Sequence, residues 1–124
     1  MLFIAGNSGS GPDLIFYGGV ISWNTWDGTT NQIAAIPASA TNGSFHNYVL
    51  VNDSVSNTAK LYYDGSLLGT ATYKNASATT VYTIGGDPSY LWNGSIANSM
   101  VYNRALTADE ITTNFTYFRT RFGI

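Results

Sequence analysis

Short runs of β-branched, aromatic and aliphatic residues alternate with glycine-, asparagine- and serine-rich stretches along most of the chain. Runs spaced by about 8–12 residues, with turn signals between them, are typical of the strands of a β-sandwich. The pattern therefore predicts an all-β fold. The expected strands lie at 1–5, 14–17, 20–23, 32–36, 45–53, 60–63, 66–68, 79–84 and 95–102.

One turn stands out because its residues specify its geometry. Asp64 and Gly65 separate the strand-like runs 60–63 and 66–68. An Asp-Gly dipeptide readily accepts the positive φ angles of a type I′ turn, whose twist suits a two-residue hairpin loop. The sequence therefore predicts a β-hairpin centred on these two residues.

The last segment follows a helical period. Thr107 and Glu110 have the spacing of a capping box, in which each side chain bonds to the backbone N–H of the other residue. Hydrophobic residues then recur at offsets of 0, 4, 7 and 11, followed by basic residues and a terminal glycine. These residues are Ile111, Phe115, Phe118, Phe122, Arg119, Arg121 and Gly123. We expect one amphipathic helix over about 107–120, with its hydrophobic side covered by the sandwich or by a neighbouring chain.

Composition narrows the classes of function. The 124 residues are expected to form one domain, 1–124, and only 10% of them are charged, against about 25% in ordinary soluble proteins. The net charge is -2 without a basic run, which argues against nucleic acid as a partner. The absence of cysteine excludes thiol, zinc-thiolate and disulfide chemistry. No apolar run reaches the ~18 residues of a membrane span, so no membrane partner is expected.

The apolar segment 1–5 has no basic leader and is shorter than a signal-peptide core. We interpret it as a strand that starts almost at the first residue. Such a strand needs a neighbour on each side, because an unpaired sheet edge associates readily with other chains. The edge near Met1 is therefore an expected association site.

Four motifs in order resemble the laminin-G-like domains of the concanavalin A-like lectin/glucanase superfamily. A fifth, at 45–48, has Phe45 where such domains often have tryptophan. The resemblance covers about the last eighty residues well and the first forty loosely. It implies an antiparallel jelly-roll β-sandwich with one C-terminal amphipathic helix. Complete members usually have several strands before this point, so the sandwich is expected to be N-terminally shortened or completed by a partner. The four motifs are Leu-Tyr-Tyr-Asp-Gly at 61–65, Tyr-Thr-Ile-Gly-Gly at 82–86, Trp-Asn-Gly-Ser-Ile at 92–96 and Val-Tyr-Asn-Arg-Ala-Leu-Thr-Ala-Asp-Glu-Ile at 101–111.

The last residues narrow the resemblance. Segment 114–124, Asn-Phe-Thr-Tyr-Phe-Arg-Thr-Arg-Phe-Gly-Ile, is similar to the ending of many laminin-G-like domains in bacteriophage structural proteins. Relatives often have an acidic residue at Ala97 and an arginine or other polar residue at Met100. Together with the low charge, Met100 favours a sheet face covered by another subunit. Sequence drift on a tolerant surface is an equal alternative.

No pair of residues fits a glycosidase. Retaining glycosidases need two carboxylates about 5 Å apart. The single glutamate, Glu110, is accounted for as a helix cap, and the six aspartates are scattered through turns. His46 has no cysteine or second histidine to pair with, so we interpret it as a structural histidine on a strand face beside Tyr48. We therefore do not expect an enzyme.

Aromatic side chains near the expected loops are candidate recognition elements, because sugars stack on such rings while amides bind their hydroxyl groups. Packing in loops or the core is the alternative, favoured for Trp92 because the family commonly has a large inward-packed residue there. Trp26 is the stronger candidate for exposure. The candidate glycan-binding residues are Trp23, Trp26, Asp27, Tyr90, Trp92 and Asn93.

Calcium is the cofactor that the resemblance leaves open, because many laminin-G-like and lectin domains bind it through loop oxygens. The available ligands are Asp27, Asn31 and Asp87. Ca²⁺ takes six to eight oxygens, and no dense acidic loop supplies them. We therefore expect no cofactor and interpret these residues as turn formers.

Two hypotheses remain. The first is a non-enzymatic virion structural or accessory module at the virion surface, a capsid decoration or a tail or fibre component. It would associate with other virion subunits or with itself as a homo-oligomer. The alternative is a carbohydrate-binding, lectin-like module that recognises surface glycans.

Overall fold

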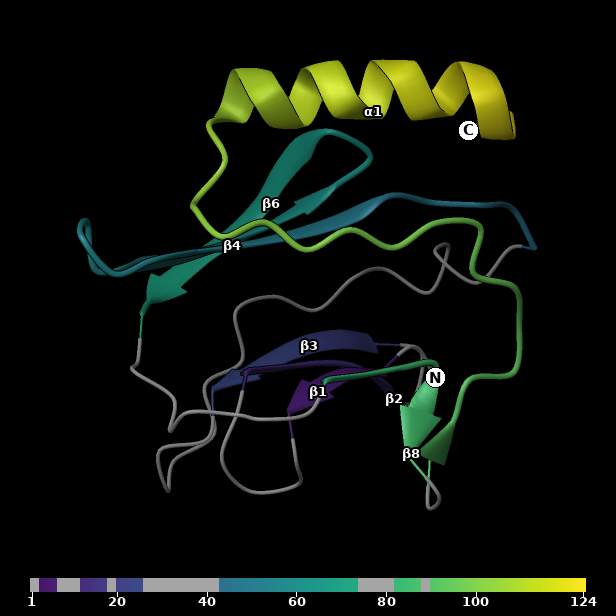
Figure 1. The fold of residues 1–124 in the computed structure, drawn as a ribbon, viewed down its shortest axis with the longest axis horizontal. Coiled ribbons are helices and arrows are strands. Elements are labelled where there is room, and N and C mark those ends of the chain that lie inside the picture. The colour runs from purple at the N-terminus through teal and green to yellow at the C-terminus, as the bar shows by residue number, and fades with distance from the viewer. Residues whose placement is uncertain (1–2, 7–11, 18–19, 26–42, 74–81, 88–89) are drawn as a thin grey trace.

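The computed structural model describes residues 3–6, 12–17, 20–25, 43–73, 82–87 and 90–124, with side chains in 43–73, 84–85 and 92–124. Two antiparallel sheets lie one above the other, and a single helix covers the outer face of the second sheet (Figure 1). The expected all-β body with one C-terminal helix is confirmed. The described strands do not make up a full jelly roll.

The first sheet has the strand order β3-β2-β1-β7. In this sheet Ile4 of β1 lies opposite Leu14 on one side and Ile84 on the other. Strand β1 is therefore paired along both edges, and the open edge expected near Met1 is wrong for this strand. The reason is that a strand from much later in the chain, β7, returns to its free side. The bounds are β1 Phe3–Gly6, β2 Pro12–Tyr17, β3 Val20–Thr25 and β7 Tyr82–Ile84.

The second sheet has the order β4-β5-β6, with strands β4 Tyr48–Asp53, β5 Thr58–Tyr63 and β6 Ser66–Thr72. Asp64 and Gly65 join β5 to β6 with φ angles of 47° and 77°, both positive as a type I′ turn requires. The predicted hairpin is confirmed. A third, short ladder pairs β8 Gly86–Asp87 with β9 Tyr90–Leu91.

The expected strand at 95–102 is not formed, and the expected strand at 32–36 lies outside the described residues. The residue pattern of 95–102 suits an extended backbone, but a strand also needs the edge of a neighbouring strand to pair with. Here the chain instead runs past the second sheet (Figure 1) and brings Ala105 and Leu106 against the sheet residues under the helix.

Helix α1, Ala108–Phe122, is capped as predicted. The backbone N–H of Glu110 donates to Thr107 Oγ1 at 3.3 Å, and the N–H of Thr107 donates to the Glu110 carboxylate at 2.9 Å. At the other end Gly123 has a φ of 71° and donates its N–H to the Arg119 carbonyl at 2.9 Å. Both ends follow from local chemistry, because unpaired N–H groups need an acceptor and a left-handed cap favours glycine.

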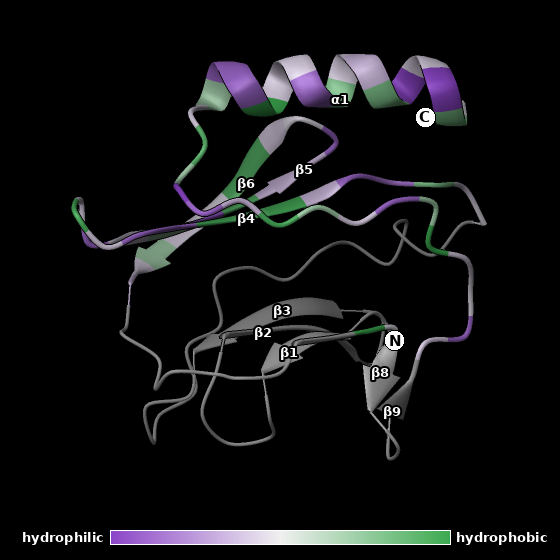
Figure 2. Cartoon of the chain, in the orientation of Figure 1, coloured by the Kyte–Doolittle hydropathy of each residue, from purple (hydrophilic) through white to green (hydrophobic). Residues whose placement is uncertain are grey.

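The core under α1 is small. Val51, Tyr62 and Ile111 are buried together, and Val49, Ala105 and Leu106 pack against them. Figure 2 shows the hydrophobic stretches of β4 and β6 beneath the helix. Full burial of an isoleucine side chain contributes about 1.5–3 kcal/mol, so Ile111 is the main anchor of the helix.

Candidate binding surfaces

The candidate residues named from the sequence fall mostly where side chains are not described. Trp26, Asp27 and Asn31 lie outside the described residues. Trp23 lies in β3, while Asp87 and Tyr90 are register partners of the β8–β9 ladder, known from the backbone alone. Trp92 and Asn93 follow β9 and have described side chains.

Trp92 is half-buried, whereas Asn93 is exposed. The N–H of Trp92 donates to the Gly85 carbonyl at 2.7 Å. Gly94 lies directly against the indole, since a Cβ atom at that position would come within 2.7 Å of Trp92 Nε1. The ring therefore packs on its own chain and fixes the start of the segment that follows.

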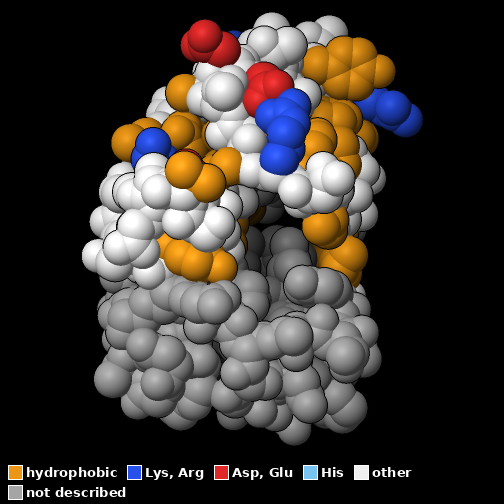
Figure 3. Space-filling view, turned by 60° about the vertical axis from the view of Figure 1, so that its left-hand side comes forward, with side chains coloured by type: hydrophobic (Ala, Val, Ile, Leu, Met, Phe, Trp, Pro, Cys, Tyr) orange, Lys and Arg blue, Asp and Glu red, His pale blue; other side chains and the backbone are white. Residues whose placement is uncertain are grey.

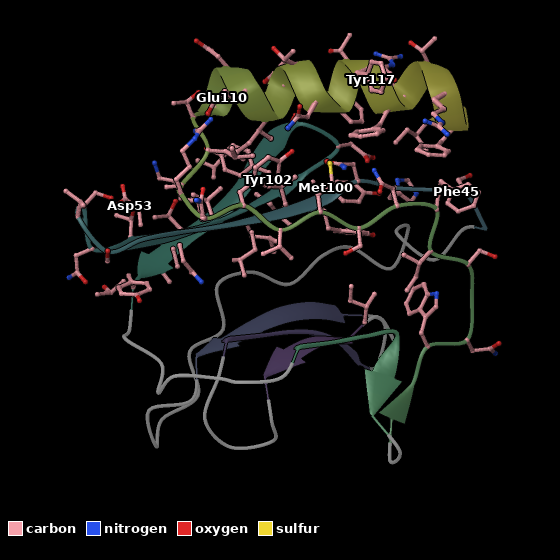
Figure 4. The ribbon with its side chains drawn as sticks, in the orientation of Figure 1. Phe45, Asp53, Met100, Tyr102, Glu110 and Tyr117 are labelled. Carbon is pink, nitrogen blue, oxygen red and sulfur yellow. The ribbon has the colours of Figure 1, made fainter. Side chains whose placement is uncertain are left out.

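That segment, 93–103, exposes hydrophobic side chains to solvent. The large hydrophobic residues in it are Ile96, Met100, Val101 and Tyr102. We call these four residues the apolar segment. Met100 is 47% exposed and Val101 is 76% exposed. Met100 therefore presents an apolar side chain to solvent, but from a segment that is not a strand of either sheet. Figure 4 places Met100 and Tyr102 on the chain that crosses beneath α1, and Figure 3 shows hydrophobic patches on the flanks of the described part with few charged side chains among them.

The backbone of 93–103 is also unpaired. Within the part of the chain that the structure describes, none of its N–H or C=O groups is hydrogen bonded to another backbone group. The segment contains no charged residue. A backbone whose hydrogen-bonding groups have no backbone partner among the described residues, and which carries apolar side chains, can pair with an added strand.

A groove of about 280 Å³ lies where this segment meets the first turns of α1. Asn114 Nδ2 donates to the Tyr102 hydroxyl at 3.2 Å, and that hydroxyl donates to the Met100 sulfur at 3.5 Å. The groove therefore borders the apolar segment through Tyr102. Its lining residues are Tyr102, Arg104, Leu106, Asp109, Glu110, Thr113 and Asn114.

Two charges in the groove neutralise each other. The Arg104 guanidinium donates two hydrogen bonds to the Glu110 carboxylate, at 2.6 and 2.8 Å. These bonds, and the N–H of Thr107 after them, lower the pKa of Glu110 to about 2. The pKa of Arg104 is raised by the same contact. Asp109 forms no ion pair with another described residue, so the groove has one net negative charge.

A second polar cluster surrounds His46, just before β4. Its Nδ1 lies 2.8 Å from Asp64 Oδ2 and 2.8 Å from the Tyr63 hydroxyl. Asp64 Oδ1 accepts a hydrogen bond from the N–H of Asn47 at 2.9 Å. Burial raises the pKa of Tyr48, whose ring lies 5.2 Å from that of Tyr63. These bonds attach the hairpin turn to the start of β4, which is a structural role.

The described residues contain no group of three or more His, Asp or Glu side chains placed to hold a metal ion. Among them, no helix is both long and apolar enough to cross a membrane.

Sequence reasoning found Met100 but missed the groove. Arg104 and Glu110 are six residues apart, and Tyr102 and Asn114 are twelve apart. Neither pair can be found from the i, i+3 or i, i+4 spacing of a helix, because the first residue of each pair lies before the helix. The sequence did contain one signal, Glu110. Helix capping uses one oxygen of its carboxylate, so the other oxygen can accept a hydrogen bond from a second partner.

Comparison with known proteins gives one family. The laminin-G model described as the concanavalin A-like lectin/glucanases superfamily matches residues 1–112. Among solved structures, the chain is similar to residues 221–444 of an S-layer domain-containing protein from Clostridium thermocellum ATCC 27405, with 18% identity and a TM-score of 0.43. That match covers 93% of this chain and 61% of the other, so the chain spans less than two thirds of its length. Comparison with curated proteins finds no match.

Proposed function

The chain belongs to the concanavalin A-like lectin/glucanases superfamily of β-sandwich domains, and on this premise we propose that it is a non-enzymatic structural or accessory module of a virion. In this proposal it is a capsid decoration or a tail or fibre component, exposed at the virion surface. It acts by association with other virion subunits or with itself. In this proposal its sandwich is a jelly roll to which a partner adds a strand.

The observation that carries the proposal is the apolar segment, Ile96, Met100, Val101 and Tyr102. Removing apolar surface from water contributes about 25 cal/mol per Å², and the unpaired backbone of 93–103 offers hydrogen bonds to an added strand. A partner strand therefore gains both kinds of interaction at one place. The similarity of segment 114–124 to bacteriophage laminin-G-like domains supports the virion as the setting.

Binding to virions tests the association. The purified chain is sedimented with particles isolated from the lysate that produces it, and its own mass is measured by size-exclusion chromatography with light scattering. We expect Val101→Asp to weaken association at least 10-fold, because it places a charge in an apolar contact. The matched control is Val55→Asp, since Val55 is 96% exposed at the β4–β5 turn, outside the apolar segment. A wild-type chain that stays monomeric and does not sediment with virions would contradict the proposal.

The location has a separate test. Antibodies raised against the chain should label intact particles from that lysate in electron micrographs. Label found only in the soluble fraction would place the protein elsewhere and overturn the virion assignment, whatever the chain binds in solution.

The groove beside Tyr102 favours glycan binding as the second candidate function. It combines an aromatic ring, an amide, a carboxylate and a hydroxyl group, from Tyr102, Asn114, Asp109 and Thr113. Such groups stack on sugar rings and bind sugar hydroxyls. A glycan array tests it with Asn114→Ala, which should lose binding, and Thr120→Ala, which leaves the groove lining intact. Flat responses from the wild-type chain would remove this candidate.

A further inference from the structure

The segment 93–103 exposes one asparagine that lies directly before a glycine. Asn93 and Gly94 are both exposed. The Asn93 amide makes no hydrogen bond with another residue that the structure describes, and the N–H of Gly94 donates to no described backbone carbonyl. Two more asparagines of this segment, Asn98 and Asn103, are also exposed, but serine and arginine follow them. Asn93 is thus the asparagine of the segment whose side chain lies next to an unhindered backbone nitrogen.

Such a pair of residues can react with itself. Glycine has no Cβ atom to hinder approach to its nitrogen, and it tolerates the backbone angles that ring closure needs. After a base in solution removes the N–H proton, the Gly94 nitrogen bonds to Cγ of Asn93, the Cγ–Nδ2 bond breaks, and ammonia leaves with a proton from water. Water then opens the cyclic imide at either carbonyl, which gives aspartate or isoaspartate and restores the N–H. No atom is oxidised or reduced.

We infer that Asn93 is a site of spontaneous deamidation, with the Gly94 nitrogen as the nucleophile and water as the co-reactant. Folding does not prevent the reaction, because this segment has no backbone pairing among the described residues that would have to open first. The folded chain should therefore react at Asn93 about as fast as the unfolded chain.

The hairpin turn gives a protected counterpart in the same chain. Asp64 also lies before a glycine, Gly65, and an aspartate forms the same cyclic imide with loss of water. Its carboxylate, however, accepts a hydrogen bond from the N–H of Asn47 at 2.9 Å and lies 2.8 Å from Nδ1 of His46. Turning Cγ of Asp64 toward the Gly65 nitrogen would break these contacts, so this site should react only when the chain unfolds.

Deamidation of Asn93 changes the chain at a packed point. A Cβ atom at Gly94 would lie 2.7 Å from Trp92 Nε1, so the indole leaves little room there. Isoaspartate routes the main chain through the former side chain and lengthens it by a methylene group. Either product also adds a negative charge to a segment that has none. We therefore expect the modified chain to present the apolar segment to a partner less well. This consequence rests on the proposed function, whereas the reaction itself does not.

Peptide mapping of the full chain tests the reaction. The chain is aged near neutral pH, folded or in urea, and trypsin then releases residues 61–74 and 75–104, which contain Asp64 and Asn93. Fragmentation in the mass spectrometer locates the gain in mass and separates isoaspartate from aspartate. In the folded chain we expect Asn93 to react at least about 10-fold faster than Asn98 or Asn103, because a side chain on the next residue restricts the backbone. Asn93→Ser removes the site and is the matched control.

The comparison with urea shows whether the fold permits the reaction. We expect the rate at Asn93 to change less than about 3-fold on unfolding, since no local opening is needed. Isoaspartate at Asp64 should form at least about 10-fold faster in urea, where the hydrogen bonds of its carboxylate are lost. Strong protection of Asn93 in the folded chain, or a rate at Asn93 no greater than that at Asn98, would overturn the inference.

Virion binding tests the consequence separately. Fresh and aged samples of the wild-type chain and of Asn93→Ser are sedimented with virions. We expect the deamidated wild-type chain to bind at least about 3-fold more weakly than the fresh chain, since it carries a charge beside an apolar contact. Aged Asn93→Ser should bind like fresh Asn93→Ser. Equal binding of fresh and deamidated wild-type chains would overturn the consequence for docking. A fresh wild-type chain that does not bind virions would contradict the proposed function alone, because peptide mapping still decides the inference.

Discussion

At the scale of single residues, Glu110 of helix α1 is bonded both to the helix N-cap and to the segment before the helix. Its carboxylate accepts a hydrogen bond from the N–H of Thr107, which closes the helix cap, and two more from Arg104, which lies outside the helix. The ion pair fixes the segment before α1, and with it one wall of the groove. Because the pKa of Glu110 is lowered from 4.5 to about 2, this contribution depends on pH.

The sign of that dependence follows from the lowered pKa. A carboxyl whose pKa is lower in the folded state stabilises the fold fully above its unfolded pKa, near 4.5, and loses this effect as the pH falls toward 2. We therefore expect Glu110→Gln to lower the thermal midpoint at pH 5–7, with the difference from wild type vanishing near pH 2. Glutamine still reaches back to the cap, so the variant removes the charge alone.

The measurement is thermal unfolding followed by circular dichroism from pH 2 to pH 7. Asp109→Asn is the control, since it removes a neighbouring carboxylate that makes no ion pair with a described residue. A Glu110→Gln difference that persists unchanged at pH 2 would show that the stabilisation is not ionic.

At the scale of elements, the β5–β6 turn also positions the helix. Gly65 has a φ of 77°, and a Cβ atom there would lie 2.8 Å from Phe115 Cδ1. The glycine is thus required twice, for the backbone angle and for the close approach of α1. The sequence could show only the first requirement, because the second depends on where the helix docks.

A pair of substitutions separates these two requirements. Gly43 also has a positive φ, 84°, but a Cβ atom there meets nothing within 4 Å. We expect Gly43→Ala to cost about 1–2 kcal/mol from the left-handed backbone alone, and Gly65→Ala to cost about 1–3 kcal/mol more through overpacking. Urea unfolding measures both free energies. Phe115→Leu should relieve part of the Gly65→Ala cost, and strict additivity of the two changes would argue against the contact.

At the scale of the whole molecule, the sequence predicted what neighbouring residues determine. The Asp64-Gly65 hairpin and the helix with its caps are specified within a few residues, and they are as expected. The strand at 95–102 and the open edge near Met1 were wrong, because each depends on which distant segment comes alongside. The groove was missed for the same reason: it forms only where the chain before the helix lies against its first turns.

Whether a distant segment pairs with 93–103 can be measured directly. Its composition suits a strand, yet its backbone bonds to no other backbone in the described part of the chain. Hydrogen exchange of the dilute chain should therefore be fast at the amides of 95–103 and slow at those of β5, which pairs on both sides. Adding virions should protect 95–103 and leave the exposed turn at Val55 unchanged. Slow exchange of 95–103 in the dilute chain would mean that the segment is already paired, and the apolar segment would then be part of the fold and not a docking site.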